Sequence, residues 1–188
     1  LHYSNHYADQ IIPTGPHKNE VAQIQNFENE IWLAHGSKNE NWDPTWSRSE
    51  ISTLTKDTWI HTNTLVENEI LDPVAIAKRG NTTYVASWQN GLAELIDGEL
   101  SIVYNETNSS LQSRAAHNDW TNIGDLKFDS KGNLWCTNAQ TIEPLSVLYT
   151  DGEWESFSLG NTVTESQNLA KLMIDENDRK WVQLKNNG

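Results

Sequence analysis

The stretch that decides the fold is IGDLKFDSKGNLWCTN, which runs from Ile123 to Asn138. It contains a short apolar segment, a polar turn with Asp129 and Gly132, and a second apolar segment that carries Trp135. Two such segments around a turn rich in Asp, Asn and Gly are typical of a β-hairpin. The stretch therefore predicts two antiparallel strands, with Asp129 tightening the turn through its side chain.

Three other stretches repeat this pattern along the chain. They read VAQIQNFENEIWLAHG (21–36), VAIAKRGNTTYVASWQNG (74–91) and LAKLMIDENDRKWVQLKNNG (169–188). The aligned aromatic residues are Trp32, Tyr84, Trp135 and Trp181. A spacing of roughly 50 residues between them indicates a repeat architecture in which each unit is one supersecondary element.

A second hairpin follows the first in three of these units. It is clearest in GLAELIDGELSIVY (91–104) and SVLYTDGEWESF (146–157), and a looser copy, EISTLTKDTWIHT, begins at Glu50. Asp97-Gly98 and Asp151-Gly152 suit two-residue turns, because both positions of such a turn need positive φ angles. Four strands in roughly 50 residues is the period of a propeller blade.

The sequence therefore predicts an all-β fold, a β-propeller with four-stranded antiparallel blades. We divide residues 1–188 into a partial unit at 1–20, blades at 21–66, 72–110 and 122–160, and a half blade at 168–188. Two arrangements satisfy this division. The chain is a fragment of a larger propeller, or its two ends pair to close a four-bladed ring, and we favour the fragment because most propellers have more blades.

Charge and cysteine content exclude several classes of protein. The 188 residues include 13 Lys or Arg and 26 Asp or Glu, a formal net charge of −13, which disfavours nucleic acid as a partner. No apolar run approaches the roughly 20 residues of a membrane-spanning helix. Cys136 is the single cysteine, so an intrachain disulfide is excluded, and its apolar neighbours predict a buried, inert thiol.

The histidines and carboxylates form no motif of a known catalytic or metal site. His2 and His6 have the spacing of a helical metal-binding pair, but they lie in a polar, aromatic stretch without a helical pattern. His35, His61 and His117 are far apart in the sequence, and a propeller could still bring such residues together. We therefore predict no enzyme activity, no metal and no cofactor.

Four tryptophans are candidates for binding a ligand or a partner. Trp42, Trp46 and Trp120 lie in irregular segments, where an indole can stack on a sugar ring or anchor a protein, or can simply cover a blade edge. Trp88 lies where the second and third strands of its unit join. Because such loops rim one face of a propeller, we expect Trp88 to be exposed there.

Several long stretches go beyond a generic blade. IIPTGPHKNEVAQIQNFENEIWLAHGSKNENW (11–42), YVASWQNGLAELIDGELSIVYNETNSSLQS (84–113) and IGDLKFDSKGNLWCTNAQTIEPLSVLYTDGEWESF (123–157) resemble the PorZ-like propellers of the Bacteroidetes type IX secretion system. A shorter core, D-x-x-G-x-L-W with N-G-L, also resembles two-component regulator propellers. Tyr84 departs from the usual Trp, and the loop from Gly36 to Ser49 is long.

The resemblance implies a function outside the cytoplasm, in the periplasm or at the outer-membrane surface. A PorZ-like protein has two propellers and a C-terminal sorting domain, and it assists a sortase that links anionic lipopolysaccharide to secreted cargo without being the transferase. The resemblance therefore implies that this chain is a non-catalytic binding or assembly module. Its partner would be a protein, a surface polysaccharide or a lipopolysaccharide. The alternative is a glycan-sensing propeller of a hybrid two-component system, and a propeller hydrolase is a third class.

Overall fold

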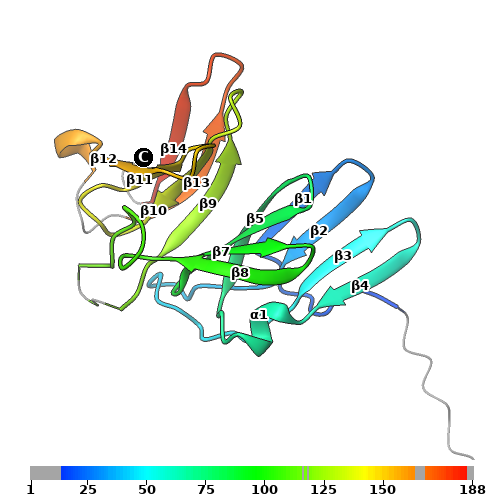
Figure 1. The fold of residues 1–188 in the computed structure, drawn as a ribbon. Helices are drawn as coiled ribbons and strands as arrows, with labels where there is room; N and C mark the ends of the chain where they lie inside the picture. The colour runs from blue at the N-terminus through cyan, green and yellow to red at the C-terminus, as the bar shows by residue number, and fades with distance from the viewer. Residues whose placement is uncertain (1–13, 116, 118, 164–167, 186–188) are drawn as a thin grey trace, which may run out of the picture.

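The fold consists of consecutive antiparallel β-sheets, as predicted (Figure 1). The computed structural model describes residues 14–115, 117, 119–163 and 168–185. The first sheet contains β1 (Gln23–Phe27), β2 (Glu30–Ala34), β3 (Ile51–Thr55) and β4 (Thr58–Thr62). The second contains β5 (Pro73–Arg79), β6 (Thr82–Ser87), β7 (Gly91–Ile96) and β8 (Glu99–Tyr104).

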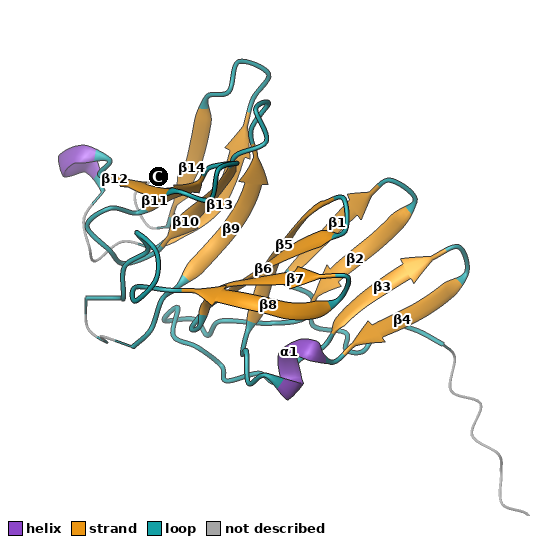
Figure 2. Cartoon of the chain, in the orientation of Figure 1, coloured by secondary structure: helices purple, strands orange, loops and turns teal. Residues whose placement is uncertain are grey.

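The third sheet contains β9 (Ile123–Phe128), β10 (Leu134–Asn138), β11 (Leu145–Leu148) and β12 (Trp154–Phe157). In the last sheet, β13 (Leu169–Ile174) pairs with β14 (Lys180–Leu184). Two short helices, α1 (Thr64–Glu67) and the 3₁₀ turn η1 (Gly160–Thr162), lie in connections between sheets (Figure 2). No helix among the described residues has the length and apolar character needed to cross a membrane.

Each four-stranded sheet is a meander in which neighbours in sequence are neighbours in space. This is the connectivity of a propeller blade. The strands of the described residues form separate sheets and close into no barrel, in agreement with the predicted propeller fragment, and the expected first strand near Ile11 lies outside these residues. The His2–His6 pair also lies outside them.

In the third and fourth units, the hairpin turn is tightened by an aspartate carboxylate that also holds the repeat tryptophan. Asp129 accepts hydrogen bonds from the main-chain N–H groups of Lys131 (3.0 Å) and Asn133 (2.9 Å), and from Trp135 Nε1 (2.9 Å). Asp175 accepts the corresponding bond from Trp181 Nε1 at 3.0 Å. The Asx-type turn predicted at Asp129 is therefore confirmed, and the sequence pattern D-x-x-G-x-L-W is explained by this geometry.

Removing the Asp129 carboxylate tests how much its hydrogen bonds contribute to the stability of the fold. We expect Asp129→Ala to lower the free energy of unfolding by about 1–2 kcal/mol, because four donors, including the Asn133 side-chain amide, lose a charged acceptor. Burial works to raise the pKa of Asp129, but the bonds from Trp135 and Asn133 outweigh it and the pKa is lowered. This contribution is therefore full above pH 4 and declines as the pH falls further. Urea unfolding at pH 7 and pH 3 measures both effects, and an unchanged mutational difference at pH 3 would contradict the second.

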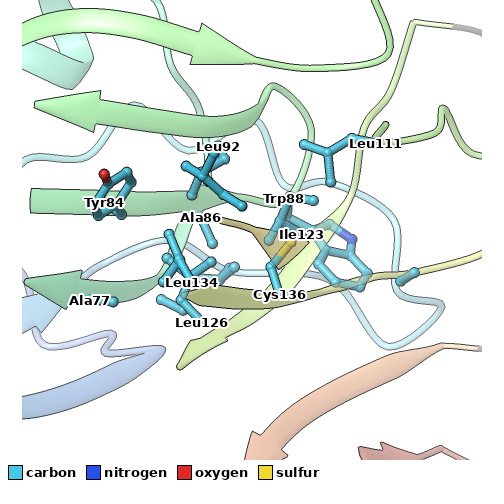
Figure 3. Close-up of a cluster of buried hydrophobic side chains, with 14 residues drawn as sticks. Ala77, Tyr84, Ala86, Trp88, Leu92, Leu111, Ile123, Leu126, Leu134 and Cys136 are labelled. Atoms are coloured by element: carbon cyan, nitrogen blue, oxygen red, sulfur yellow. The ribbon is translucent and has the colours of Figure 1, made fainter. Parts of the chain in front are cut away.

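The largest core lies between the second and third sheets (Figure 3). It contains residues of β5, β6, β7, β9, β10 and β11, including Ala86, Leu92, Ile123 and Leu134. Cys136 is fully buried in it, and burial raises the pKa of its thiol to about 12, as expected for an inert cysteine. A second core between the first two sheets is centred on Ile51 and Ile76.

Near the inner edge of the sheets, two buried side chains link one sheet to the next. Gln23 on β1 accepts a bond from the main chain of Ile76 (2.6 Å) and donates to Asp125 on β9 (2.8 Å). The other oxygen of Asp125 accepts a bond from the main chain of Leu172 (3.1 Å) on β13. Gly124 permits the close approach of β9 to β13, because a Cβ there would overlap the main chain at Leu169. These contacts hold the first strands of the four units, β1, β5, β9 and β13, close together.

Candidate functional site

A pocket of about 500 Å³ opens where the inner strands come together. Its walls come from all four repeat units, so no single blade could form it. The lining residues are Glu20, Val21, Ala22, Gly36, Ser37, Lys38, Trp42, Val74, Gly124, Ala170, Lys171 and Gln183. A concave site with mixed apolar and polar walls is the usual form of a small-ligand site.

The long loop after β2 places an amine and an indole in this pocket. Asn39 Oδ1 accepts hydrogen bonds from the main-chain N–H groups of Asn41 and Asp43, both at 2.9 Å, which is an Asx-type turn. Trp42 sits in this turn with φ at 65°, a left-handed conformation that costs a bulky residue energy. The loop is therefore built to hold the Trp42 ring in one position.

Lys38 extends its ammonium group into a corner formed by two indoles. Its Nζ lies 3.8 Å from the ring centre of Trp42 and 4.0 Å from that of Trp88, and the two rings meet edge to face at 5.5 Å. Both contacts are cation–π interactions. Within the described parts of the chain, no carboxylate lies within ion-pair distance of Lys38.

Two more lysines add positive charge beside Lys38. Lys171 lines the same pocket, and Lys185 donates to the carbonyl of Glu40 at 2.9 Å while its Nζ lies 5.0 Å from the Trp42 ring. Burial above all, together with the charges of Lys171 and Lys185, lowers the pKa of Lys38 to about 8, against the opposing effect of Asp125. The oxygens of Asp125 already serve Gln23 and main-chain donors.

The pocket is therefore a local concentration of positive charge on a chain whose formal net charge is −13. A second cavity of about 450 Å³ between the first two sheets offers a comparison. There Lys78 pairs with Glu30 at 3.1 Å, so its charge is compensated within the protein. Lys38 and Lys171 in the first pocket, and Lys185 beside it, lack such a pairing among the described residues.

Trp88 contributes to this site from below its surface. It was expected to be exposed on a rim loop, but this is wrong, because its side chain is fully buried in the core between the second and third sheets (Figure 3). The loop after β2 folds over it, and Trp88 Nε1 donates to the carbonyl of Trp42 at 2.7 Å. Trp88 supports Trp42 and Lys38 and presents no free surface of its own.

Trp46 and Trp120 form a separate pair. Their rings meet edge to face at 5.5 Å, and the ring of Trp120 stacks on His117 at 3.8 Å. Trp46 is 51% exposed and has φ at 59°, so its ring is presented outward on a fixed backbone. The structure thus groups the four predicted tryptophans as Trp42 with Trp88 and Trp46 with Trp120.

The buried carboxylate of Asp72 holds the backbone beneath Trp46. It accepts hydrogen bonds from the main-chain N–H groups of Thr45 (3.0 Å), Trp46 (2.9 Å) and Ser47 (3.0 Å), and from the Thr45 hydroxyl (2.6 Å). Asp72 is completely buried. The long loop is therefore anchored at its end as well as at the Asn39 turn.

The sequence reading found the tryptophans but missed the lysines. One signal was available for Lys171, which occupies the repeat position held by Gln23, Ile76 and Asp125 in the other units. Lys38 lies in an irregular loop outside the repeat, and Lys185 lies just after β14, so nothing in their local sequence marks them. Among the described residues, no group of three or more His, Cys, Asp or Glu side chains has the geometry of a metal site.

Neither models of known protein families nor curated protein sequences match this chain. Among solved structures, it is similar to PorZ, an essential bacterial surface component of the type IX secretion system of Porphyromonas gingivalis, with a TM-score of 0.76 and 21% sequence identity. The match covers 93% of this chain and 24% of the PorZ chain, so the chain spans about a quarter of that protein's length.

Two further similarities are weaker. The extracellular domain of a protein described as a one-component system of B. thetaiotaomicron matches with a TM-score of 0.57 and 14% identity, over 88% of this chain and 22% of that one. The computationally designed protein Ika4 matches with a TM-score of 0.54 and 9% identity, over 94% and 98%. The resemblance inferred from the sequence is thus confirmed at the level of the fold: this chain has a β-propeller fold that is similar to that of PorZ.

Proposed function

We propose that this chain is a non-catalytic binding module that acts outside the cytoplasm and holds an anionic group of a surface polysaccharide or lipopolysaccharide in the lysine pocket. The observation that carries the proposal is that Lys38 and Lys171 line one pocket, with Lys185 close to its Trp42 ring, and that none of the three has a carboxylate partner among the described residues. The similarity of the fold to a surface component of a type IX secretion system supports the proposed location outside the cytoplasm.

The chemistry of the pocket suits an acidic sugar. A carboxylate or phosphate accepts charge-assisted hydrogen bonds from ammonium groups, and such bonds are stronger in a partly buried site than in water. The half-buried ring of Trp42, which also lines the pocket, offers an apolar face on which a sugar ring can stack. The ammonium groups would thus recognise the charge of the ligand, and the neighbouring indole would contact its sugar ring.

The carboxylates around the pocket support a binding role over hydrolysis. Most enzymes that cleave glycosidic bonds use two carboxyl groups facing each other across the substrate. Asp125 is buried and its oxygens are already hydrogen-bonded, and of the described residues that line the pocket only Glu20 carries a carboxylate. These described residues favour binding over the two-carboxylate chemistry of most glycosidases.

A glycan-sensing role in a two-component system is the alternative. The similarity in fold to an extracellular domain of a one-component system favours it as the second candidate. Both roles use the same pocket and differ in what the rest of the protein does with the bound ligand. A helical kinase-linked region in the full protein would favour sensing, and a sorting domain would favour assembly.

Binding of an acidic polysaccharide tests the proposed function directly. Titration calorimetry at pH 7 with a uronate-containing or phosphate-containing oligosaccharide, and with a neutral oligosaccharide of equal length, compares the two ligands. We expect tighter binding of the acidic ligand, and we expect Lys171→Gln to weaken it about tenfold, which is about 1.4 kcal/mol. Binding should also weaken between pH 7 and pH 9, because Lys38 with a pKa of about 8 loses its charge there.

Lys131 provides the matched control. It is an exposed lysine in the β9–β10 turn, far from the pocket lining, so Lys131→Gln removes the same net charge. If Lys131→Gln weakens binding as much as Lys171→Gln does, the effect is one of overall charge and the pocket is not the site. Equal affinity for acidic and neutral ligands would also reject the proposal.

A further inference from the structure

The second tryptophan pair, Trp46 with Trp120, lies at the same end of the sheets as the lysine pocket. In an antiparallel meander, the first strand begins at the end of the sheet where the second and fourth strands finish. The pocket is lined by residues at the starts of the first strands, β1, β5, β9 and β13, and by residues just after β2. Trp46 lies in the β2–β3 connection and Trp120 in the β8–β9 connection, so both belong to this end.

A continuous set of contacts joins the pair to the pocket. The ring of Trp120 meets that of Trp46 at 5.5 Å, and the guanidinium of Arg114 lies 5.7 Å from the centre of the Trp120 ring. Arg114 donates to the Asp43 carboxylate at 2.7 Å. Asp43 follows Trp42, which lines the pocket. The pair therefore adjoins the pocket, and the Cα atoms of Trp42 and Trp46 are at most about 14 Å apart.

The position of the Trp46 ring is fixed although the ring is half-exposed. Its side chain is 51% exposed, and its φ of 59° is a left-handed conformation that costs a bulky residue energy. The buried carboxylate of Asp72 keeps this conformation through its four hydrogen bonds from residues 45–47. Core packing does not explain this arrangement, since half of the indole faces solvent. The backbone geometry thus presents the ring outward.

The surroundings of the Trp46 ring favour a neutral sugar residue. Arg114 is already paired with Asp43. Arg48, two residues after Trp46, is paired with Glu69 at 3.2 Å. These charges compensate one another, in contrast to the lysines of the pocket, so they offer little to an acidic group. The indole face that remains exposed can stack on a sugar ring.

A protein is the other class of partner that an exposed tryptophan pair can contact. A stable protein interface ordinarily covers about 800 Å² of each partner around an apolar centre. Trp46 is the one exposed large hydrophobic residue among residues 36–50, all of which the structure describes, and its neighbours Thr45, Ser47 and Arg48 are polar. A single indole among polar groups, next to a charged pocket, suits a sugar better than a protein surface.

We propose that Trp46, supported by Trp120, is a second subsite beside the lysine pocket. It stacks on a neutral sugar residue of the same polysaccharide whose acidic residue the pocket holds. This inference rests on the proposed function of the pocket. A ligand that reaches both places gains from the second contact, because the first one already holds it nearby. The chain would therefore prefer a polysaccharide that contains both acidic and neutral sugars.

Oligosaccharides of alternating glucuronate and N-acetylglucosamine test the subsite in the whole chain. Two-dimensional NMR at pH 7 follows the indole N–H signals during titration, and the signal of Trp46 is the one that is missing in Trp46→Ala. We expect the hexasaccharide to bind at least about tenfold more tightly than the disaccharide, which is too short to reach both places. The hexasaccharide should shift the Trp46 signal, and the disaccharide should leave it unmoved.

Three variants separate the subsite from general effects. Trp46→Ala should remove the tenfold gain and leave the affinity for the disaccharide unchanged, whereas Trp46→Tyr keeps an aromatic face and should retain part of the gain. Trp181→Ala is the matched control, because that ring is 54% exposed but lies at the start of β14, at the opposite end of its sheet. It should alter the binding of neither ligand.

The outcomes distinguish the subsite from the pocket. Binding of the disaccharide without a gain for the hexasaccharide, or a gain that survives in Trp46→Ala, would overturn the subsite and leave the proposed function standing. A Trp46 signal that neither oligosaccharide shifts would also overturn it and would favour a protein contact for the pair. A hexasaccharide that binds through Trp46 and is unaffected by Lys171→Gln would reject the pocket and keep the subsite. The absence of any binding would reject both.

Discussion

Trp88→Ala is expected to lower the free energy of unfolding by about 3–5 kcal/mol, the usual cost of truncating a large buried aromatic residue. Trp88 is completely buried between the second and third sheets, where the removed atoms would leave a cavity. Its Nε1–H also holds the long loop through the carbonyl of Trp42, so the substitution also loses a hydrogen bond. Urea unfolding followed by far-ultraviolet circular dichroism measures the change.

Trp46→Ala is the matched control, because it removes the same side chain from a half-exposed position. We expect this variant to lose less than about 1.5 kcal/mol, since little of its surface is withdrawn from water. If Trp88→Ala fails to fold, Trp88→Phe retains most of the buried ring and should still lose about 1–2 kcal/mol. Equal losses in Trp88→Ala and Trp46→Ala would contradict the central role given to Trp88.

Asp72→Asn is expected to lower the free energy of unfolding by about 2–3 kcal/mol. The buried carboxylate accepts four hydrogen bonds from residues 45–47, and an amide in its place presents an N–H₂ group to some of these donors. Asp72 has φ at 48°, a conformation that Asn tolerates well, so the loss reports on the carboxylate rather than on backbone strain.

The same substitution should loosen the loop that presents Trp46. Limited proteolysis at neutral pH is expected to cleave Asp72→Asn faster within residues 37–50 than the unchanged protein. Asp57→Ala, in the exposed β3–β4 turn, serves as the control and should alter neither stability nor cleavage appreciably. An Asp72→Asn variant as stable as the control would show that the carboxylate is dispensable to the loop.

The two tryptophan pairs make different contributions to any ligand site. Trp42 and Trp88 surround the ammonium of Lys38 and so fix the charge in the pocket, whereas Trp46 and Trp120 lie apart from the pocket lining. Substitution of Trp46 therefore separates a surface role of the second pair from the role of the pocket. A long polysaccharide could contact both pairs, because the loop after β2 carries Trp42 and Trp46 four residues apart.

The fold class followed from the sequence because its determinants are local and repeated. The alternation of short apolar strands, the turn aspartates and the spacing of Trp32, Tyr84, Trp135 and Trp181 each specify a hairpin within a few residues. The hydrogen bond between Trp135 and Asp129 lies within a single hairpin, so the sequence pattern that produces it could be recognised without the structure. Four such copies specified blades, and the sheets have the predicted connectivity.

The site was decided by tertiary structure because its parts come from different blades. Lys38, Lys171 and Lys185 lie up to 147 positions apart, and only the convergence of the inner strands places them around one pocket. The burial of Trp88 likewise depends on a loop more than forty residues earlier folding over it, which no local pattern specifies. His17, His35 and His61 meet at Ser52 for the same reason. Hairpins are selected by short-range turn and strand chemistry, whereas charge clusters and hydrogen-bond hubs arise only when packed sheets bring distant residues into contact.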